Sequence, residues 1–269
     1  MYEINLKEFS TLKKIILKYF HQISDEKVEK ILEMIKKFSP RILLSKKNIS
    51  IKQSSGRSFI VLTDFMAVKC FTLTENYLAD LRPILKLNQI GFKHIVQLLD
   101  YNSDYNLLGM EKLKLIYKRK YLLQEYTNLE FIKNLIYIIV NTISTLFIYN
   151  SQINKDFSVS NVGINSLGIV KVFDFELCCY IDKNNEYQCR VDLYYTFRGF
   201  MDDLILSIKN KNIQKVVKDF LDDFNSKLTV VDSYENPDYR GNYKKTKIRS
   251  FRYLDFNSII TYVNSWQKN

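Results

Sequence analysis

Apolar residues recur at three- and four-residue steps between residues 4 and 38, a pattern that predicts two amphipathic helices. The second helix begins after Ser24, a typical N-cap residue, and its first turn is acidic. Its apolar face ends before Pro40. The apolar positions are Leu6, Phe9, Leu12, Ile16 and Phe20 in the first helix and Val28, Ile31, Leu32 and Ile35 in the second. We expect this hairpin, residues 1–45, to be an accessory segment that packs onto the rest of the protein.

Short extended runs replace the helical pattern after residue 48. Three strands are predicted, at Ile49–Lys52, Phe59–Leu62 and Phe65–Phe71. The turn-rich loop Ser54–Ser58 joins the first two, and Thr63–Asp64 makes a tight turn into the third. A helical segment follows at Thr74–Leu87, where Pro83 is expected to end or kink the helix.

Longer helical patterns dominate the second half of the chain. Glu130–Asn150 includes the most apolar stretch and is predicted to be a long buried helix, and Phe256–Trp266 is predicted to be a closing helix. Between them, Gly163 and Gly168 bracket a short hairpin. The last part of the chain is basic and rich in tyrosine, most of all at Arg240–Arg249. Short strands and long helices together predict an α+β protein.

The composition is that of a folded protein. The 269 residues are 46% hydrophobic and 14% aromatic, with only three prolines and seven glycines, which argues against extensive disorder. No apolar run free of polar residues reaches the ~18 residues of a membrane span, so no transmembrane segment is expected. The four cysteines lack the spacing of a zinc site and the density of a disulfide scaffold. We therefore expect reduced cysteines and a cytoplasmic location.

The formal net charge of +11 suits anionic partners such as ATP, acidic protein segments, nucleic acid or a membrane surface. An AT-rich genome, which favours codons for Lys, Asn and Ile, would produce the same surplus. The lysines are spread along the chain rather than grouped in one run. Because charge is the only feature that supports nucleic-acid binding, that role is the least favoured.

Two short stretches, Asn154–Asn161 and Val172–Glu176, contain the residues with the clearest chemical potential. Asn161 follows Asp156 by five residues, and Asp174 follows Asn161 by thirteen. This spacing resembles the catalytic loop and metal-binding turn of protein kinases. The resemblance implies that Asp156 orients the attacking hydroxyl and takes its proton, while Asn161 and Asp174 bind magnesium. An Asp and an Asn at this spacing are also common in loops that merely turn the chain, so the surrounding motifs matter.

Phe65–Phe71 carries one lysine, Lys69, inside an apolar run and resembles the V-A-I-K strand whose lysine pairs with nucleotide phosphates. Taken alone, such a lysine is more often the solvent-facing residue of an edge strand. A protein kinase also needs a carboxylate on the next helix to hold this lysine. Asp80 lies nearest the expected place, with Glu75 as the second candidate. His94–Tyr101 then resembles the strand that follows this helix.

Two further segments resemble the nucleotide-binding part of a protein kinase. Leu107–Leu113 resembles the strand and hinge that receive adenine, with Met110 at the gatekeeper position and Glu111 and Leu113 beside it. The loop before the second strand has a single glycine, Gly56, where the family pattern has three. Glycines let backbone N–H groups close over the phosphates, so ATP binding is expected to be weak.

In order and spacing, residues 45–225 are similar to the eukaryotic protein kinase superfamily. The resemblance implies a bilobal fold, with residues 46–113 forming a small antiparallel β lobe with one helix and residues 114–269 a larger, mainly helical lobe with a basic extension. It implies ATP and magnesium as cofactors and a protein substrate or partner. Compact kinases with eroded motifs are familiar from large DNA viruses. The composition suits such an origin, which would place the protein in the host cytoplasm.

Departures from the family pattern favour a pseudokinase, a kinase-shaped interaction module without activity. Asn154 and Lys155 replace the usual His-Arg, Ser158 replaces the lysine typical of Ser/Thr kinases, and Glu176 replaces the glycine of D-F-G. The four residues with direct chemical roles are nevertheless present: Lys69, Asp156, Asn161 and Asp174. We therefore expect a divergent Ser/Thr protein kinase and keep the pseudokinase as the alternative.

A small-molecule kinase is the second alternative. Asp-Phe-Glu, ending here at Glu176, often replaces D-F-G in the aminoglycoside and choline kinases, which this part of the chain also resembles. Only seventeen residues separate Asp174 from Asp192, so the activation segment is short and offers little platform for a peptide. Asp192 resembles the aspartate that hydrogen-bonds the kinase catalytic loop from a later helix.

Overall fold

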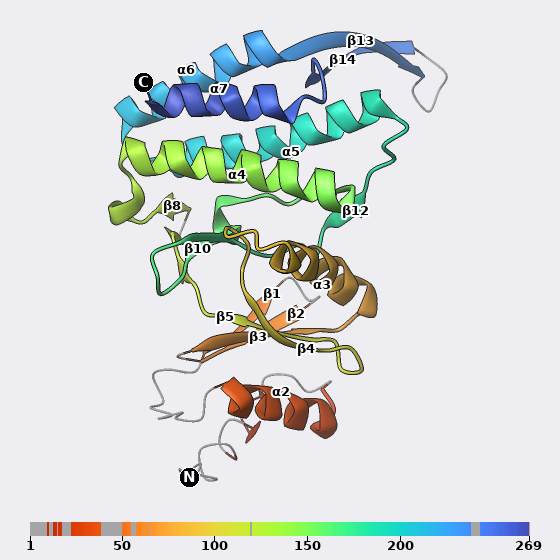
Figure 1. Ribbon diagram of the computed structural model, residues 1–269, viewed down its shortest axis with the longest axis vertical. Helices are drawn as coiled ribbons and strands as arrows, with labels where there is room; N and C mark the ends of the chain where they lie inside the picture. The colour runs from red at the N-terminus through yellow and green to blue at the C-terminus, as the bar shows by residue number, and fades with distance from the viewer. Residues whose placement is uncertain are drawn as a thin grey trace. The chain divides into compact units, whose positions relative to one another are not determined.

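The computed structural model describes residues 10, 13–14, 16–17, 23–38, 50–54, 58–63, 65–118, 120–237 and 243–268. In this part the chain is a mixed α+β protein with six α-helices and several small antiparallel sheets (Figure 1). The chain divides into two compact units. Unit 1 comprises Met1–Lys114 with Asn165–Ile169, and unit 2 comprises Leu115–Ile164 with Val170–Asn269.

Unit 1 contains a five-stranded antiparallel sheet in the order β1-β2-β3-β5-β4. Its strands are β1 Ser50–Ser54, β2 Ser58–Leu62, β3 Met66–Phe71, β4 Leu98–Asn102 and β5 Leu107–Glu111. The first three confirm the strands predicted from the apolar pattern. Thr63 fixes the turn between β2 and β3, because its hydroxyl oxygen accepts hydrogen bonds from the backbone N–H groups of Phe65 and Met66. The β4 strand is shorter than the predicted segment His94–Tyr101.

Helix α3 (Thr74–Gln89) packs against β3, β4 and β5. Of the two effects expected of Pro83, ending or kinking this helix, the first does not occur, because α3 continues past it to Gln89. A proline inside a helix removes one backbone hydrogen bond and costs about 3 kcal/mol. Burial offsets this cost, because Pro83 is itself buried together with Tyr77, Leu81 and Ile84 of the same helix.

Helix α2 (Asp25–Phe38) packs against β3 and β5, and Figure 1 shows α2 and α3 on opposite sides of the sheet. Its predicted start is confirmed, because the Ser24 hydroxyl oxygen accepts a hydrogen bond from the backbone N–H of Lys27 at 3.2 Å. The predicted apolar face is buried in one cluster with β2 and β3. Of the first predicted helix, residues 10, 13–14 and 16–17 are described and helical, and Ile16 is buried in that cluster.

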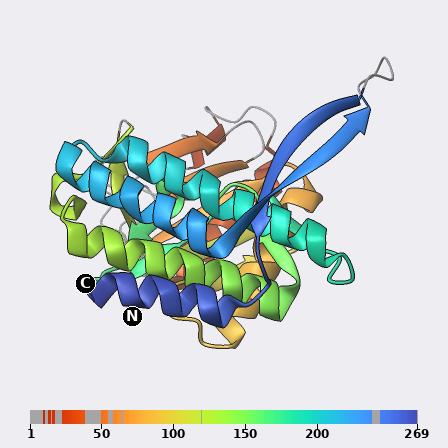
Figure 2. The ribbon, with the colours of Figure 1, turned by 90° about the horizontal axis from the view of Figure 1, so that it is seen from above.

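Unit 2 is built around four helices. They are α4 Leu129–Asn150, α5 Glu186–Ser207, α6 Lys211–Leu228 and α7 Phe256–Lys268. The α4 helix packs against α5 and α7, and α5 packs against α6 (Figures 1 and 2). The predicted buried helix and closing helix are therefore confirmed. Within the described residues, α4 is also the one helix long and apolar enough to cross a membrane, although 67% of its most apolar stretch is buried, as in a core helix.

Short strands and turns in unit 2 position its polar loops. They are β7 Tyr117–Lys118, β8 Tyr121–Leu122, the 3-10 turn η1 Gln124–Tyr126, β9 Gln152–Asn154, the 3-10 turn η2 Val159–Asn161, β10 Val162–Ile164, β11 Val170–Val172 and β12 Cys178–Tyr180. The β9 and β12 strands pair, and β10 pairs with both β11 and β6 (Lys114–Leu115). The predicted hairpin between Gly163 and Gly168 is the β10–β11 pair.

A long two-stranded ribbon precedes α7 and was not predicted. Its strands, β13 (Thr229–Pro237) and β14 (Tyr243–Phe251), pair antiparallel along their whole length. Figure 2 shows the ribbon extending away from the helices of unit 2. Its base is anchored by Phe251, whose ring packs edge-on against Tyr194 of α5 and Phe224 of α6. Residues 238–242 of the predicted basic segment lie outside the described residues.

Candidate functional site

Asn154 joins the two polar stretches of unit 2. Its amide nitrogen donates a hydrogen bond to the backbone carbonyl of Asp174 at 3.0 Å. Its amide oxygen accepts one from the backbone N–H of Asp156, also at 3.0 Å. The residue is fully buried at the end of β9, whose pairing with β12 places it opposite Cys178. A single buried amide therefore fixes the backbone of Asp156 relative to that of Asp174.

Asn161 closes the same loop from its other end. Its side-chain nitrogen donates to the carbonyl of Asp156 at 3.1 Å, and its own carbonyl accepts from the N–H of Phe173 at 3.1 Å. These bonds bring Asp156, Asn161 and the β11–Asp174 turn together within unit 2. The side-chain oxygen of Asn161 accepts from the Ser160 hydroxyl at a long 3.4 Å and has a second lone pair for a cation.

Asp174 has a left-handed backbone conformation, with a φ of 69°. This region is rare for residues other than glycine, and asparagine and aspartate enter it most readily. Such strain costs on the order of 1–3 kcal/mol and persists only where the surroundings impose it. Here the next residue, Phe175, is fully buried, and its ring packs edge-on against Phe157 of the neighbouring loop at 6.4 Å. The contact between the Phe157 and Phe175 rings thus packs the loop of Asp156 against the turn of Asp174.

Asp203 of α5 supports the loop that follows Asp156. Its carboxylate accepts hydrogen bonds from the Ser158 hydroxyl at 2.9 Å and from the backbone N–H of Val159 at 2.7 Å. The expectation that Asp192 would do this is wrong, because Asp192 accepts from Gln188 on its own helix at 2.7 Å. With 3.6 residues per turn, positions 192 and 203 lie on one face of α5 about three turns apart. Sequence spacing alone could not decide between them.

Ser158 has a structural role where the family pattern has a lysine. Its hydroxyl caps η2 by accepting from the backbone N–H of Ser160 at 3.1 Å and donates to Asp203. Lys155 is exposed, and its backbone N–H donates to the carbonyl of Leu177 at 3.3 Å. Hydrogen bonds to Asp203 of α5 therefore hold this loop, and position 158 carries no cation.

In unit 1, Lys69 and Asp80 form a buried ion pair. The ammonium nitrogen of Lys69 lies 2.8 Å from a carboxylate oxygen of Asp80, and the two side chains are 3% and 1% exposed. The same nitrogen lies 5.0 Å from the centre of the Phe71 ring. Glu75 is exposed in the first turn of α3. Of the two carboxylates that the sequence offered for Lys69, the structure pairs Asp80.

The predicted adenine-binding segment is β5 and the residues after it. Met110 is buried, and Leu113 is half-buried. Glu111 accepts hydrogen bonds from the backbone N–H of Gln97 at 2.8 Å and from the side chain of Asn165 at 3.1 Å. Its carboxylate therefore connects three segments of unit 1. Gly56 and its two neighbours lie outside the described residues.

The oxygen atoms of Asn161 and Asp174 suit a hard cation such as magnesium. Magnesium is commonly held by one or two carboxylates, with substrate phosphates and water completing its octahedral shell. Within the described residues, no group of three or more His, Cys, Asp or Glu side chains is placed to hold a metal. The donor set therefore fits a metal that a nucleotide helps to bind. The four cysteines all lie in the described residues and form no disulfide bond there.

The loops around Asp156 are thus assembled by three residues that the sequence did not single out for this purpose. In the sequence Asn154 and Ser158 stand out only as departures from the kinase pattern, and Asp203 does not stand out. The only sequence signal for Asp203 is its spacing from Asp192 along a helix. The chain matches no model of a known protein family and no curated protein.

Proposed function

We propose that the protein is a magnesium- and ATP-dependent phosphotransferase with a bilobal, kinase-like fold, acting on Ser or Thr hydroxyls of a protein substrate. The observation that carries the proposal is the loop assembly of unit 2, in which Asn154 and Asn161 bind the backbone of Asp156 and of the Asp174 turn. Phosphoryl transfer depends on this type of positioning, because the protein contributes little covalent chemistry of its own.

Asp156 is the residue that we assign to the attacking hydroxyl. Its N–H and carbonyl are both held by buried asparagines, whereas the residue itself is exposed. The carboxylate is therefore anchored through its backbone and can accept a hydrogen bond from a substrate hydroxyl. It orients this group and receives its proton as the new phosphorus–oxygen bond forms and the bond from the γ-phosphorus to the departing ADP breaks.

Asn161 and Asp174 would hold magnesium through their side-chain oxygens. When bound, the metal neutralises charge on the nucleotide phosphates. Within unit 1, Lys69 is the cation that we assign to nucleotide phosphates, and Asp80 holds its ammonium group at 2.8 Å. Asp203 positions the loop by binding Ser158 and Val159 but touches no reacting atom.

One observation favours the pseudokinase alternative. The Ser158 hydroxyl is bound to Asp203, so position 158 supplies no cation to the transferring phosphoryl group. Loss of one such preorganised contact costs about 10²–10³ in rate. The proposal therefore includes slow turnover, whereas a pseudokinase would bind a nucleotide or partner without any transfer.

Nucleotide binding is tested by thermal unfolding in the presence of millimolar MgATP. At a tenfold excess over its dissociation constant, a ligand stabilises the folded protein by about 1.4 kcal/mol. For a chain of this size that corresponds to a rise in Tm of roughly 3–6 °C. We expect this rise for wild type and for Asp192→Asn, which changes an acid outside the site. It should be absent for Asp174→Asn and without magnesium. A wild type that MgATP does not stabilise would overturn the proposal.

A further inference from the structure

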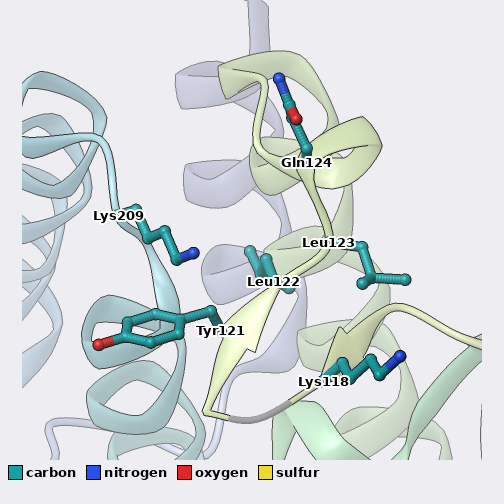
Figure 3. Close-up of a pocket in the computed structure, with 6 residues that line it drawn as sticks. All are labelled: Lys118, Tyr121, Leu122, Leu123, Gln124 and Lys209. Carbon is teal, nitrogen blue, oxygen red and sulfur yellow. The ribbon is translucent and has the colours of Figure 1, made fainter.

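Unit 2 contains a surface pocket of about 630 Å³ beside the β7–β8 hairpin (Figure 3). Three short segments line it: the hairpin, the residues leading into η1, and the segment between α5 and α6. The lining residues are Lys118, Tyr121, Leu122, Leu123, Gln124 and Lys209. Its volume is that of a site for a few side chains or a small ligand.

The pocket is positively charged. Two of its six lining residues are lysines, and none is acidic. The ammonium nitrogen of Lys209 lies 4.6 Å from the centre of the Tyr121 ring, which directs this side chain across the pocket. Neither Lys118 nor Lys209 forms an ion pair with a described residue. Both cations are therefore available to a ligand, and Leu122 and Leu123 add an apolar surface beside them.

The start of α6 adds to this positive field. The helix begins two residues after Lys209, and its first turn contains Lys211 and no acidic residue. The helices α2, α3, α4 and α5 each have an acid in the first turn. Asn210 caps this end of α6 by accepting hydrogen bonds from the backbone N–H groups of Asn212 and Ile213, but no acidic side chain in the first turn offsets its partial positive charge.

The pocket is next to the loop that carries the candidate chemistry, and both belong to unit 2. Strand β7, which supplies Lys118, packs against η2, whose last residue is Asn161. The neighbouring Tyr117 has a raised pKa, caused mainly by burial and further by the negative charge of Asp203. Since Asp203 also binds the η2 loop, a chain seated in the pocket would lie beside that loop.

We propose that this pocket recognises an acidic segment of the protein substrate, with carboxylates at Lys118 and Lys209 and an apolar side chain on Leu122 and Leu123. The proposal rests on the proposed function, because it names the substrate class of the same site. A concave pocket with two cations and an apolar wall fits a short peptide. A nucleic-acid backbone is bound by a longer series of basic residues that contact successive phosphates. A membrane surface is bound by a basic face with apolar side chains that enter the lipid.

Fluorescence anisotropy with a labelled peptide tests this directly and needs no ATP. The probe contains Asp and Glu residues around one serine and one leucine, and its control has Asn and Gln at the acidic positions. Wild type should bind the acidic peptide more tightly, and the preference should weaken as salt is added. Exposed ion pairs contribute little each, so reversing both lysines in Lys118→Glu/Lys209→Glu should weaken binding about tenfold. Lys218→Glu, on the exposed face of α6, should change it less than about twofold.

Equal affinity for the two peptides, or an unchanged affinity in the double variant, would overturn the proposal. Tighter binding of single-stranded nucleic acid or anionic vesicles that is lost in the same variant would overturn the assignment to a peptide. The MgATP-induced rise in Tm is measured on the same samples. If MgATP stabilises the protein but the acidic peptide is not preferred over its control, only this inference is refuted. If MgATP does not stabilise the protein although the acidic peptide binds, the result counts against the proposed function.

Discussion

Replacing Asn154 by alanine should damage stability and function together, because one buried amide serves both polar loops. Asn154→Ala removes a donor to the Asp174 carbonyl and an acceptor for the Asp156 N–H, both at 3.0 Å. A buried polar group that loses its partner costs about 1–3 kcal/mol. With two groups affected, one of them on the more exposed Asp156, we expect a loss of about 2–4 kcal/mol in the free energy of unfolding.

Urea unfolding measures this loss, and a MgATP titration measures the effect on the site. Asn150→Ala is the matched control, because within the described residues the side-chain hydrogen bond of Asn150 goes to Gln152, at 3.1 Å, and not to either loop. This control should lose less than about 1 kcal/mol and bind MgATP like wild type. If Asn154→Ala unfolds at the wild-type urea concentration and binds MgATP normally, the argument that this residue assembles the site is refuted.

Asn154→Asp separates the two hydrogen bonds. An aspartate can still accept from the Asp156 N–H, but it places an oxygen opposite the Asp174 carbonyl, where the amide nitrogen now donates. We expect weakened magnesium dependence of nucleotide binding, because only the Asp174 turn loses its support. Unaltered magnesium dependence in this variant would mean that the Asp174 turn is held by its other contacts.

Three further predictions concern unfolding. Gly109→Ala would place a methyl group 2.8 Å from Met34 Sδ, so the flexible Met34 side chain must move, and we expect a loss of up to about 1 kcal/mol in the free energy of unfolding. Gly199→Ala, with nothing within 4 Å, should not destabilise. Lys69→Met removes the ammonium partner of the buried Asp80 carboxylate and should cost about 3–5 kcal/mol, against less than about 1 kcal/mol for Lys30→Met at an exposed pair. Hydrogen bonds from Lys227 and Tyr262 lower the pKa of Asp223 in the folded protein. The ionised carboxylate therefore stabilises the fold above the unfolded-state pKa of about 3.9, and this contribution is lost as the pH falls through the lower, folded-state pKa. Asp223→Asn should therefore make the free energy of unfolding less sensitive to acid.

Each of these three predictions has an outcome that would contradict the structure. Stabilisation by Gly109→Ala as large as that by Gly199→Ala would mean that the Met34 side chain does not crowd Gly109. Equal losses in the free energy of unfolding for Lys69→Met and Lys30→Met would show that the Lys69–Asp80 pair is not buried. Parallel stability profiles of wild type and Asp223→Asn in acid would show that this carboxylate is not coupled to folding.

Local signals were sufficient where local forces decide the structure. The start of α2 followed from Ser24 and the apolar face behind it, and both are present. The long helix α4 followed from its apolar content. The sequence also predicts helix α3, but it does not show that the helix runs past Pro83, because the burial that offsets the lost hydrogen bond is not visible in the sequence.

Long-range contacts account for what the sequence did not reveal. The charged residues of β13 and β14 concealed this ribbon, although Thr229–Val231 is a β-branched run and the turn formers Pro237 and Gly241 separate the two strands. Asn154 was noted only as an unusual residue before Asp156, since its partner Asp174 lies twenty residues away. Asp203 and Asp192 share one face of α5, and only the packing of α5 against η2 selects the first. Site assembly therefore needed three-dimensional information that residue types alone lack.

Transfer of radiolabelled phosphate from ATP tests the central claim most directly. Purified wild type, Asp156→Asn, Asp174→Asn and the control Asp192→Asn are compared in parallel, with autophosphorylation and a mixed-protein substrate as readouts. We expect slow, magnesium-dependent labelling by wild type and Asp192→Asn, and none above background by the other two. Equal labelling by all four proteins, or none by any, would contradict the account and favour a pseudokinase. Turnover of choline or an aminoglycoside without protein labelling would move the activity to the small-molecule class.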